Sequence, residues 1–120
     1  MWRQRLNLLL LSTRLDVYTK LVYTSNVPAK LRGFDWDDAN QHHILRHGVI
    51  PKEVEEAVSQ KNVILTTKTV KREKRWKLFG KTFAGRYLVV IFTVRRKFFR
   101  AVTAYDMNAN ERRTYAPKLD

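Results

Sequence analysis

The chain has 120 residues, which is the length of one domain and too short for two independent hydrophobic cores. It contains no cysteine, which excludes disulfide bonds and thiolate metal sites, while 44% hydrophobic and 12% aromatic residues argue against wholesale disorder. Lys and Arg number 24 against 11 Asp and Glu, and the net charge of +13 favours polyanionic partners, either nucleic acid or an anionic membrane.

The first 33 residues differ in character from the rest, because their Leu and Val residues follow no clean period. The run Leu8–Leu11 is shorter than the apolar core of a signal peptide, and no segment reaches the about 18 apolar residues that span a bilayer. We therefore expect residues 1–33 to be an adventitious or poorly ordered extension, with one short helix over residues 3–12. Residues 34–120 are expected to form the functional domain, and they carry a net charge of +8.

This domain is predicted to begin with a short strand and two helices. The expected elements are a strand at residues 34–36, a helix capped by Asp37 or Asp38 that runs to His47, and a helix from Pro51 to residues 61–62. Gly48 suits the left-handed conformation that follows a helix end. Val54, Ala57 and Val58 give the second helix one apolar stripe.

Four strands and a last helix are predicted to follow, with the strands at residues 63–65, 76–78, 87–94 and 98–105. Strict alternation along the last strand places Arg100, Val102 and Ala104 on one face and Phe99, Ala101, Thr103 and Tyr105 on the other. Asn108 and Glu111 have the spacing of a capping box that opens the final helix, which Pro117 should end. The fold class is α+β, with two N-terminal helices, a four-stranded antiparallel sheet and a C-terminal helix.

His43 and His47 have the i, i+4 spacing of two zinc ligands on one helix face. Ile44 stands where a metalloprotease has its general base, and no cysteine or fourth histidine can complete the site. We therefore predict no metal site. His47 is left with either a structural role near its own helix end or a catalytic or RNA-contacting role.

The densest basic run covers residues 68–77. Such runs are usually solvated faces, and a lysine-rich hairpin loop also prevents strands from pairing at a sheet edge. Here Trp76 and Phe79 interleave with the cations, which is typical of a surface that stacks bases. The predicted RNA contacts in this run are Lys74, Arg75, Trp76 and Lys77.

Arg86 and Arg100 lie in or beside apolar strands, where an unpaired charge is costly. They could bracket one phosphate, because their forked donors suit the charge that grows on a phosphorane. The alternative is pairing with a carboxylate, for which the candidates are Glu53, Glu56, Asp106 and Glu111.

Several sequence blocks, in their order and spacing over about residues 34–116, resemble the BrnT toxin family. The blocks are Phe34-Asp35-Trp36-Asp37, Asn40, Arg46-His47-Gly48-Val49, Arg75-Trp76-Lys77-Leu78-Phe79-Gly80-Lys81-Thr82, Gly85-Arg86, Leu88-Val89-Val90-Ile91-Phe92-Thr93 and Glu111-Arg112-Arg113-Thr114-Tyr115. The resemblance implies a RelE-like fold and a ribonuclease that uses no metal or other cofactor and promotes attack of the ribose 2′-hydroxyl on the adjacent phosphate. It also implies a cognate BrnA-like, DNA-binding antitoxin, contact with operator DNA only through the antitoxin complex, a cytoplasmic location and no membrane partner.

Carried over by position, the resemblance implies catalytic roles for His47, Lys81, Arg86, Arg100 and Glu111, and further RNA contacts at Tyr105, Arg112 and Tyr115. The chain reads Thr103-Ala104-Tyr105 where the family commonly has an arginine after Ser-Ala. A tyrosine can donate a proton or stack on a base, but it brings no positive charge. An endoribonuclease toxin and a non-catalytic nucleic-acid- or antitoxin-binding module are therefore both kept, beside a weaker hypothesis of membrane binding through residues 1–33.

Overall fold

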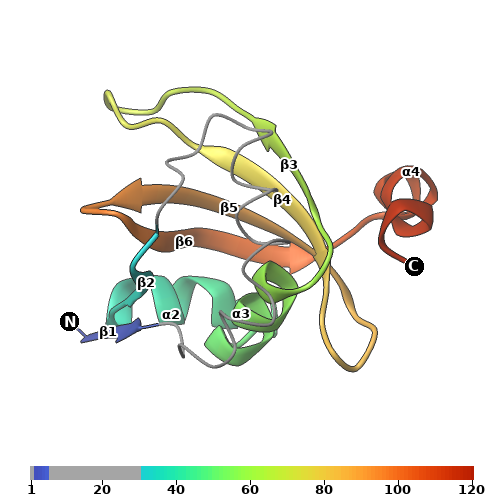
Figure 1. Ribbon diagram of the computed structural model, residues 1–120, viewed down its shortest axis with the longest axis horizontal. Helices are drawn as coiled ribbons and strands as arrows, with labels where there is room; N and C mark the ends of the chain where they lie inside the picture. Colours follow the sequence, from blue (N-terminus) through green and yellow to red (C-terminus); the bar gives the residue numbers. More distant parts are fainter. Residues whose placement is uncertain (1, 6–30) are drawn as a thin grey trace.

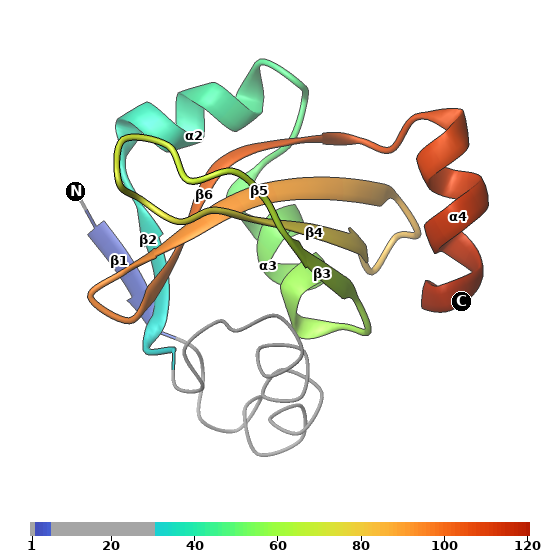
Figure 2. The ribbon, with the colours of Figure 1, turned by 90° about the horizontal axis from the view of Figure 1, so that it is seen from above.

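The computed structural model describes residues 2–5 and 31–120, with side chains from residue 31 onward. One twisted sheet packs against α2 and α3 on one face and against α4 at one end of the other face (Figures 1 and 2). The elements are β1 Trp2–Arg5, β2 Gly33–Trp36, α2 Asp38–Leu45, α3 Pro51–Ser59, β3 Val63–Thr66, β4 Trp76–Lys81, β5 Tyr87–Arg95, β6 Phe98–Asp106 and α4 Ala109–Leu119. The α+β class is confirmed.

The sheet has the strand order β1-β2-β6-β5-β4-β3, in which β2 runs parallel to β6 and every other pair is antiparallel. The prediction of a four-stranded antiparallel sheet is therefore wrong, because β2 joins the sheet beside β6. Pairing with β6 buries the apolar side chains of β2, because Phe34 and Trp36 are each only 1% exposed. The chain between β2 and β3 is occupied by α2 and α3, which makes a direct hairpin with the next strand impossible.

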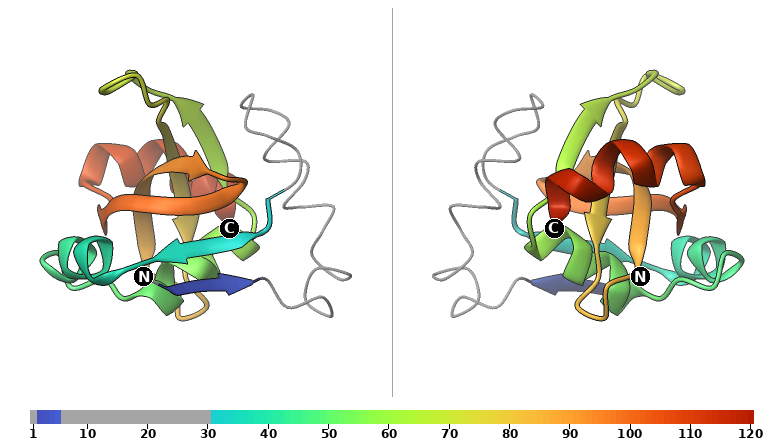
Figure 3. Two further views of the ribbon diagram at one scale, coloured as in Figure 1. Left: turned by 90° about the vertical axis from the view of Figure 1, so that its left-hand side faces the viewer. Right: turned by 90° about the vertical axis from the view of Figure 1, so that its right-hand side faces the viewer.

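Strand β1 comes from the predicted extension and pairs with β2 at the edge of the sheet (Figure 3). The helix predicted over residues 3–12 is thus wrong at residues 3–5, which lie in this strand. The remainder of that prediction, residues 6–12, lies outside the described residues.

The local signals for the first two helices hold. Asp37 caps α2, because its carboxylate accepts the backbone N–H of Asn40 at 3.0 Å while Asn40 Oδ1 accepts the N–H of Asp37 at 2.8 Å. This helix ends at Leu45 rather than His47. Pro51 begins α3, whose predicted apolar stripe is fully buried against the sheet. Gly80 on β4 allows this close packing, since a Cβ there would lie 3.0 Å from the carbonyl oxygen of Ala57.

A β-bulge shifts the register between β5 and β6, where Ile91 is opposite Thr103 but Phe92 is opposite Ala101. Val102 is the extra residue. Beyond it the predicted alternation is wrong, because Ala104 packs in the core under α2 and α3 while Tyr105 packs on the opposite face.

Helix α4 begins as predicted at the capping box of Asn108 and Glu111, whose two reciprocal hydrogen bonds measure 2.8 and 3.0 Å. It does not end at Pro117, which lies inside the helix. Proline removes only one donor there, and the extra turn lets Leu119 bury itself beside Phe79 and Met107. Tyr115 stacks on Phe79 with ring centroids 3.7 Å apart.

Candidate functional site

One face of the sheet is covered by α2 and α3, whereas α4 covers only one end of the other. We call the remaining part the open face, and its partly exposed side chains include Lys77, Ile91, Thr103 and Tyr105. The bulge at Val102 is what turns Thr103 and Tyr105 toward this face. The candidate residues gather around its margins.

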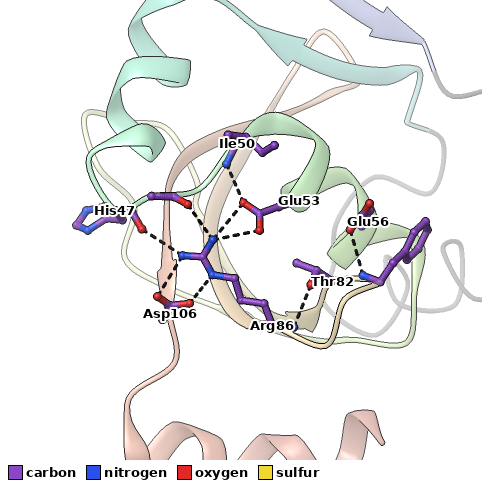
Figure 4. A network of polar contacts seen from close by, with 9 residues as sticks. His47, Ile50, Glu53, Glu56, Thr82, Arg86 and Asp106 are labelled. Atoms are coloured by element: carbon purple, nitrogen blue, oxygen red, sulfur yellow. Dashed lines mark hydrogen bonds and ion pairs between the residues drawn. The ribbon is translucent and has the colours of Figure 1, made fainter.

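Arg86 lies at the centre of a polar network that joins β5 and β6 to the loop between α2 and α3 (Figure 4). Its Nε donates to Asp106 at 2.6 Å, NH1 donates to Glu53 at 3.1 Å, and NH2 donates to Asp106 at 3.1 Å. The guanidinium also donates to the backbone carbonyls of Gly48 at 2.8 Å and His47 at 3.3 Å. All five N–H groups of Arg86 therefore have protein acceptors. Of the two predictions for this residue, phosphate binding and pairing with carboxylates, the structure shows the pairing.

The charges of this network shift the pKa values of its members. The hydrogen bond from Arg86 holds the pKa of the Asp106 carboxyl below its usual value, with further help from the charge of Arg112. The same pairing raises the pKa of Arg86, mainly through Asp106 and then Glu53. The lowered pKa of Asp106 keeps this carboxylate ionised at neutral pH, so its pairing with Arg86 persists there.

Arg100 is also paired, but with carboxylates that the sequence did not suggest. Its NH2 lies 2.9 Å from Asp37 Oδ2 and its NH1 lies 3.6 Å from Asp35 Oδ1. Burial alone would raise the pKa of Asp37, yet the N–H of Asn40 and the charge of Arg100 together lower it. The sequence identifies Asp37 as a helix cap, but the capping pattern does not indicate that Asp37 also pairs with Arg100. Arg100 NH1 is buried without a hydrogen-bond partner among the described residues.

His47 and Tyr105 come together at the margin of the open face. Their ring centroids lie 6.1 Å apart at an interplanar angle of 60°. His47 is exposed just after α2, and its backbone carbonyl is held by Arg86. Burial, assisted by the negative charge of Glu111, raises the pKa of the Tyr105 phenol. Of the predicted catalytic residues, His47, Arg86 and Glu111 are thus linked by contact or charge to one locus around Tyr105.

Lys81 belongs to a different cluster, at the last turn of α4. Its Nζ lies 2.8 Å from Asp120 Oδ1, and that carboxylate also accepts the Tyr87 hydroxyl at 2.7 Å. The hydrogen bond that Lys81 donates to Asp120 raises the pKa of the lysine. No described contact joins Lys81 to the His47–Tyr105 ring pair. Asp120 was missed from the sequence because a single terminal acid carries no pattern.

The prediction that Trp76 and Phe79 form a base-stacking surface is wrong, because both rings are buried. Trp76 and Phe79 are 5% and 2% exposed, and the Trp76 ring stacks on Phe92 inside the core. Large apolar rings on a central strand bury more surface in the core than on an open face, which overrides the pattern of alternating cations. Lys74 and Lys77 instead place their ammonium groups over these two rings at 5.4 and 5.7 Å.

The remaining predicted RNA contacts lie on several elements. Arg112 is exposed on α4, Tyr115 is half-buried by its stack on Phe79, and Arg75 is half-buried just before β4 with its Nε lacking a hydrogen-bond partner among the described residues. The structure neither tests RNA contact at these positions nor gathers them into one patch.

Two further observations concern the described residues as a whole. No three His, Asp or Glu side chains within residues 31–120 are grouped so that they could hold a metal ion. In the same part of the chain no helix is both long enough and apolar enough to cross a bilayer.

Comparison with known proteins bears on the whole domain. No curated protein matches the chain. The sequence model of one protein family, described as the ribonuclease toxin BrnT of type II toxin–antitoxin systems, matches residues 36–111. That match runs from Trp36, the last residue of β2, to the first turn of α4, and so includes the Arg86 network and the His47–Tyr105 ring pair. The chain belongs to the BrnT family of ribonuclease toxins.

Proposed function

We propose that this chain is a metal-independent endoribonuclease toxin that cuts RNA at the margin of the open face, where His47 and Tyr105 meet. The observation that carries the proposal is the 6.1 Å ring pair, which brings two proton-transferring side chains from different elements together in a ribonuclease toxin family. Cleavage of this kind inhibits translation and growth until an antitoxin neutralises the toxin.

The reaction needs one proton acceptor and one proton donor. The ribose 2′-oxygen forms a bond to the adjacent phosphorus and the bond from phosphorus to the 5′-oxygen breaks, which leaves a 2′,3′-cyclic phosphate and a 5′-hydroxyl. His47 would accept the 2′-hydroxyl proton, and Tyr105 would deliver a proton to the departing 5′-oxygen. The raised pKa of Tyr105 keeps its phenol protonated at neutral pH, so it begins the reaction in the donor form.

The two arginines would then have different tasks. Arg86 is a positioning residue, because all its donors hold the carboxylates and carbonyls that fix the segment of His47. Arg100 would stabilise the charge of a phosphate farther along β6, since it lies five positions before Tyr105 in that strand. Its side chain is 12% exposed and is paired with Asp35 and Asp37, so the phosphate would have to displace one of these carboxylates. Glu111 would support Tyr105 electrostatically.

The family supports an antitoxin protein partner and an RNA substrate. We extend this to a BrnA-like antitoxin with a DNA-binding part, so that the toxin reaches operator DNA only within that complex. Both would act in the cytoplasm, where the RNA substrate lies.

The test is expression of the chain alone, followed by incubation of the purified protein with RNA in excess EDTA. We expect growth arrest, and RNA fragments that end in a 2′,3′-cyclic phosphate. Tyr105→Phe and His47→Gln should each lower kcat by about 10²–10⁴-fold, which is the usual contribution of a proton-transfer group. Lys118→Gln, on the exposed end of α4, is the matched control and should cleave normally. Full activity of both ring variants, with folding intact, would remove the ring pair from the mechanism.

A second candidate is a non-catalytic module of the same fold that binds nucleic acid or the antitoxin. The observation that favours it is that Arg86 and Arg100 are each neutralised by two carboxylates. It predicts salt-dependent RNA binding with no cleavage products in the same assay.

A further inference from the structure

Two hairpin tips at the end of the sheet opposite α4 carry basic residues in left-handed backbone conformations (Figures 1 and 2). Lys71 and Arg72 have φ values of 50° and 64°, and Arg96 and Lys97 have values of 52° and 68°. Within the described residues no other non-glycine position has positive φ. Two successive left-handed residues form the type I′ turn that favours Asn-Gly, so long basic side chains occupy positions that disfavour them.

The two tips are held side by side by contacts at their bases. Arg95 Nε donates to Glu73 Oε2 at 2.7 Å, and Arg95 NH2 lies 3.3 Å from Glu73 Oε1. The Thr93 hydroxyl donates to the carbonyl of Lys74 at 2.8 Å. The first tip closes on itself through reciprocal backbone hydrogen bonds of 2.9 Å between Val70 and Glu73. The four turn residues therefore project from one unit whose two halves are joined by hydrogen bonds. We call this unit, residues 68–75 and 95–97, the platform.

Nearly all the excess positive charge of the domain lies on this platform. Residues 68–75 and 95–97 contain eight Lys or Arg and one Glu, a net of +7, whereas residues 34–120 as a whole carry +8. The single carboxylate, Glu73, is held by Arg95, which lowers the pKa of Glu73. Lys71, Arg72, Arg96 and Lys97 are all exposed, and none has an ion pair among the described residues. Strained backbone conformations cluster at functional sites, and concentrated positive charge attracts anionic ligands, so these turns are a candidate binding site.

The chemistry of the tips separates an RNA strand from a membrane surface. Side chains that dock on a bilayer add large apolar groups to their cations. The exposed large apolar residues of the described chain are Leu45, Ile50, Leu65 and Phe83, and none of them lies on the platform. The platform thus offers charge and no apolar anchor, which fits a phosphate backbone.

We propose that the Lys71–Arg72 and Arg96–Lys97 tips bind the phosphate backbone of the RNA substrate at a distance from the cut. This inference rests on the proposed ribonuclease function and adds a second contact region to it. Strand β6 leads from the second tip to Tyr105, and at about 3.3 Å per residue the two regions lie about 25 Å apart. RNA that occupies both must extend along the sheet, past Arg100 and Thr103.

The test replaces each tip by the dipeptide that its turn prefers: Lys71→Asn with Arg72→Gly, and Arg96→Asn with Lys97→Gly. Both changes relieve the left-handed conformation, so the variants should melt at or above the wild-type temperature. Lys52→Gln with Lys61→Gln removes the same charge from exposed sites on and after α3, and serves as the control. The probe is a 2′-O-methyl oligoribonucleotide long enough to span the sheet, which lacks the nucleophile and cannot be cut.

Each tip variant removes two cationic side chains, so it should weaken binding about 25-fold in roughly 0.1 M salt and reduce the slope of log Kobs against log[salt] by about 1.4. The control pair should change affinity less than twofold. On cleavable RNA the tip variants should raise KM and keep kcat, opposite to Tyr105→Phe.

Three results would overturn the inference: wild-type affinity in both tip variants, an equal loss in the control pair, or retention of the protein on phosphatidylserine vesicles without RNA affinity. The binding assay does not depend on cleavage. A chain that binds through its tips but never cuts would therefore refute the proposed enzyme and leave the binding surface standing.

Discussion

Replacement of Arg86 by methionine separates a positioning role from a catalytic one. Methionine keeps the aliphatic stem and removes all five donors. The contact with Asp106 contributes little, because that carboxylate is 60% exposed and exposed pairs contribute about 0–1 kcal/mol. The contact with Glu53 is better covered, at 28% and 24% exposure, and together with two backbone carbonyls it should contribute about 2 kcal/mol. We expect a total loss of about 2–3 kcal/mol in the free energy of unfolding.

Urea denaturation at neutral pH, followed by tryptophan fluorescence, measures this loss. With a slope of about 1.5 kcal/mol/M, the midpoint should fall by about 1.5 M. Arg95→Met is the matched control, because Arg95 also forms a bidentate pair but is 49% exposed, and it should cost under about 1 kcal/mol. If Arg86→Met unfolds at the wild-type midpoint yet abolishes cleavage, Arg86 acts directly on RNA and the positioning argument is wrong.

The loss of unfolding free energy in Arg86→Met should also depend on pH. The pKa of Asp106 is lowered in the folded chain, so its stabilising effect is complete above the unfolded value of about 3.9 and is lost as the pH falls through the folded value. The difference in unfolding free energy between wild type and Arg86→Met should therefore shrink below about pH 4. A difference that is constant down to pH 2 would show that Asp106 contributes nothing to it.

Two other substitutions test how the fold places the site. Asn40→Ala should cost about 3 kcal/mol in urea denaturation, because Asn40 is 4% exposed and its Nδ2 donates to the carbonyls of Asp35 and Ala101 at 3.0 and 3.1 Å; a loss below about 1 kcal/mol would mean that water replaces these bonds. Gly80→Val should lower stability by about 1–3 kcal/mol, since its Cβ would meet the Cβ and carbonyl of Ala57 at 3.0 Å, and an unchanged melting temperature would show that α3 can move away.

The features predictable from sequence are those that depend on a few neighbouring residues. The caps at Asp37 and Asn108 and the helix start at Pro51 all appear as expected. Each is set by hydrogen bonds or dihedral angles within four residues of chain. The apolar run of β5 also identifies a central strand, because burial on both faces leaves no polar alternation.

Features set by contacts between distant segments were not predictable in the same way. Strand β2 pairs in parallel with β6, and the paired residues Gly33 and Phe98 are 65 positions apart in the sequence. No local pattern indicates a pairing over that separation. The same is true of Arg100, whose partner Asp37 is a cap by every local criterion. Pro117 was expected to end α4, but the burial of Leu119 outweighs one missing hydrogen bond.

The bulge at Val102 shows why the site itself was the hardest part to predict. Period-two alternation along β6 is correct up to Ala101 and fails beyond it, because one extra residue reverses the facing of every later side chain. Without it Tyr105 would point into the core beneath α2 and α3. With it, the phenol lies on the open face, close enough to pair with His47 across the margin of the sheet. A departure from the strand pattern thus places Tyr105 at the margin where we propose that RNA is cut. Shortening β6 by deleting Val102 should abolish the ring pair together with any activity that depends on it.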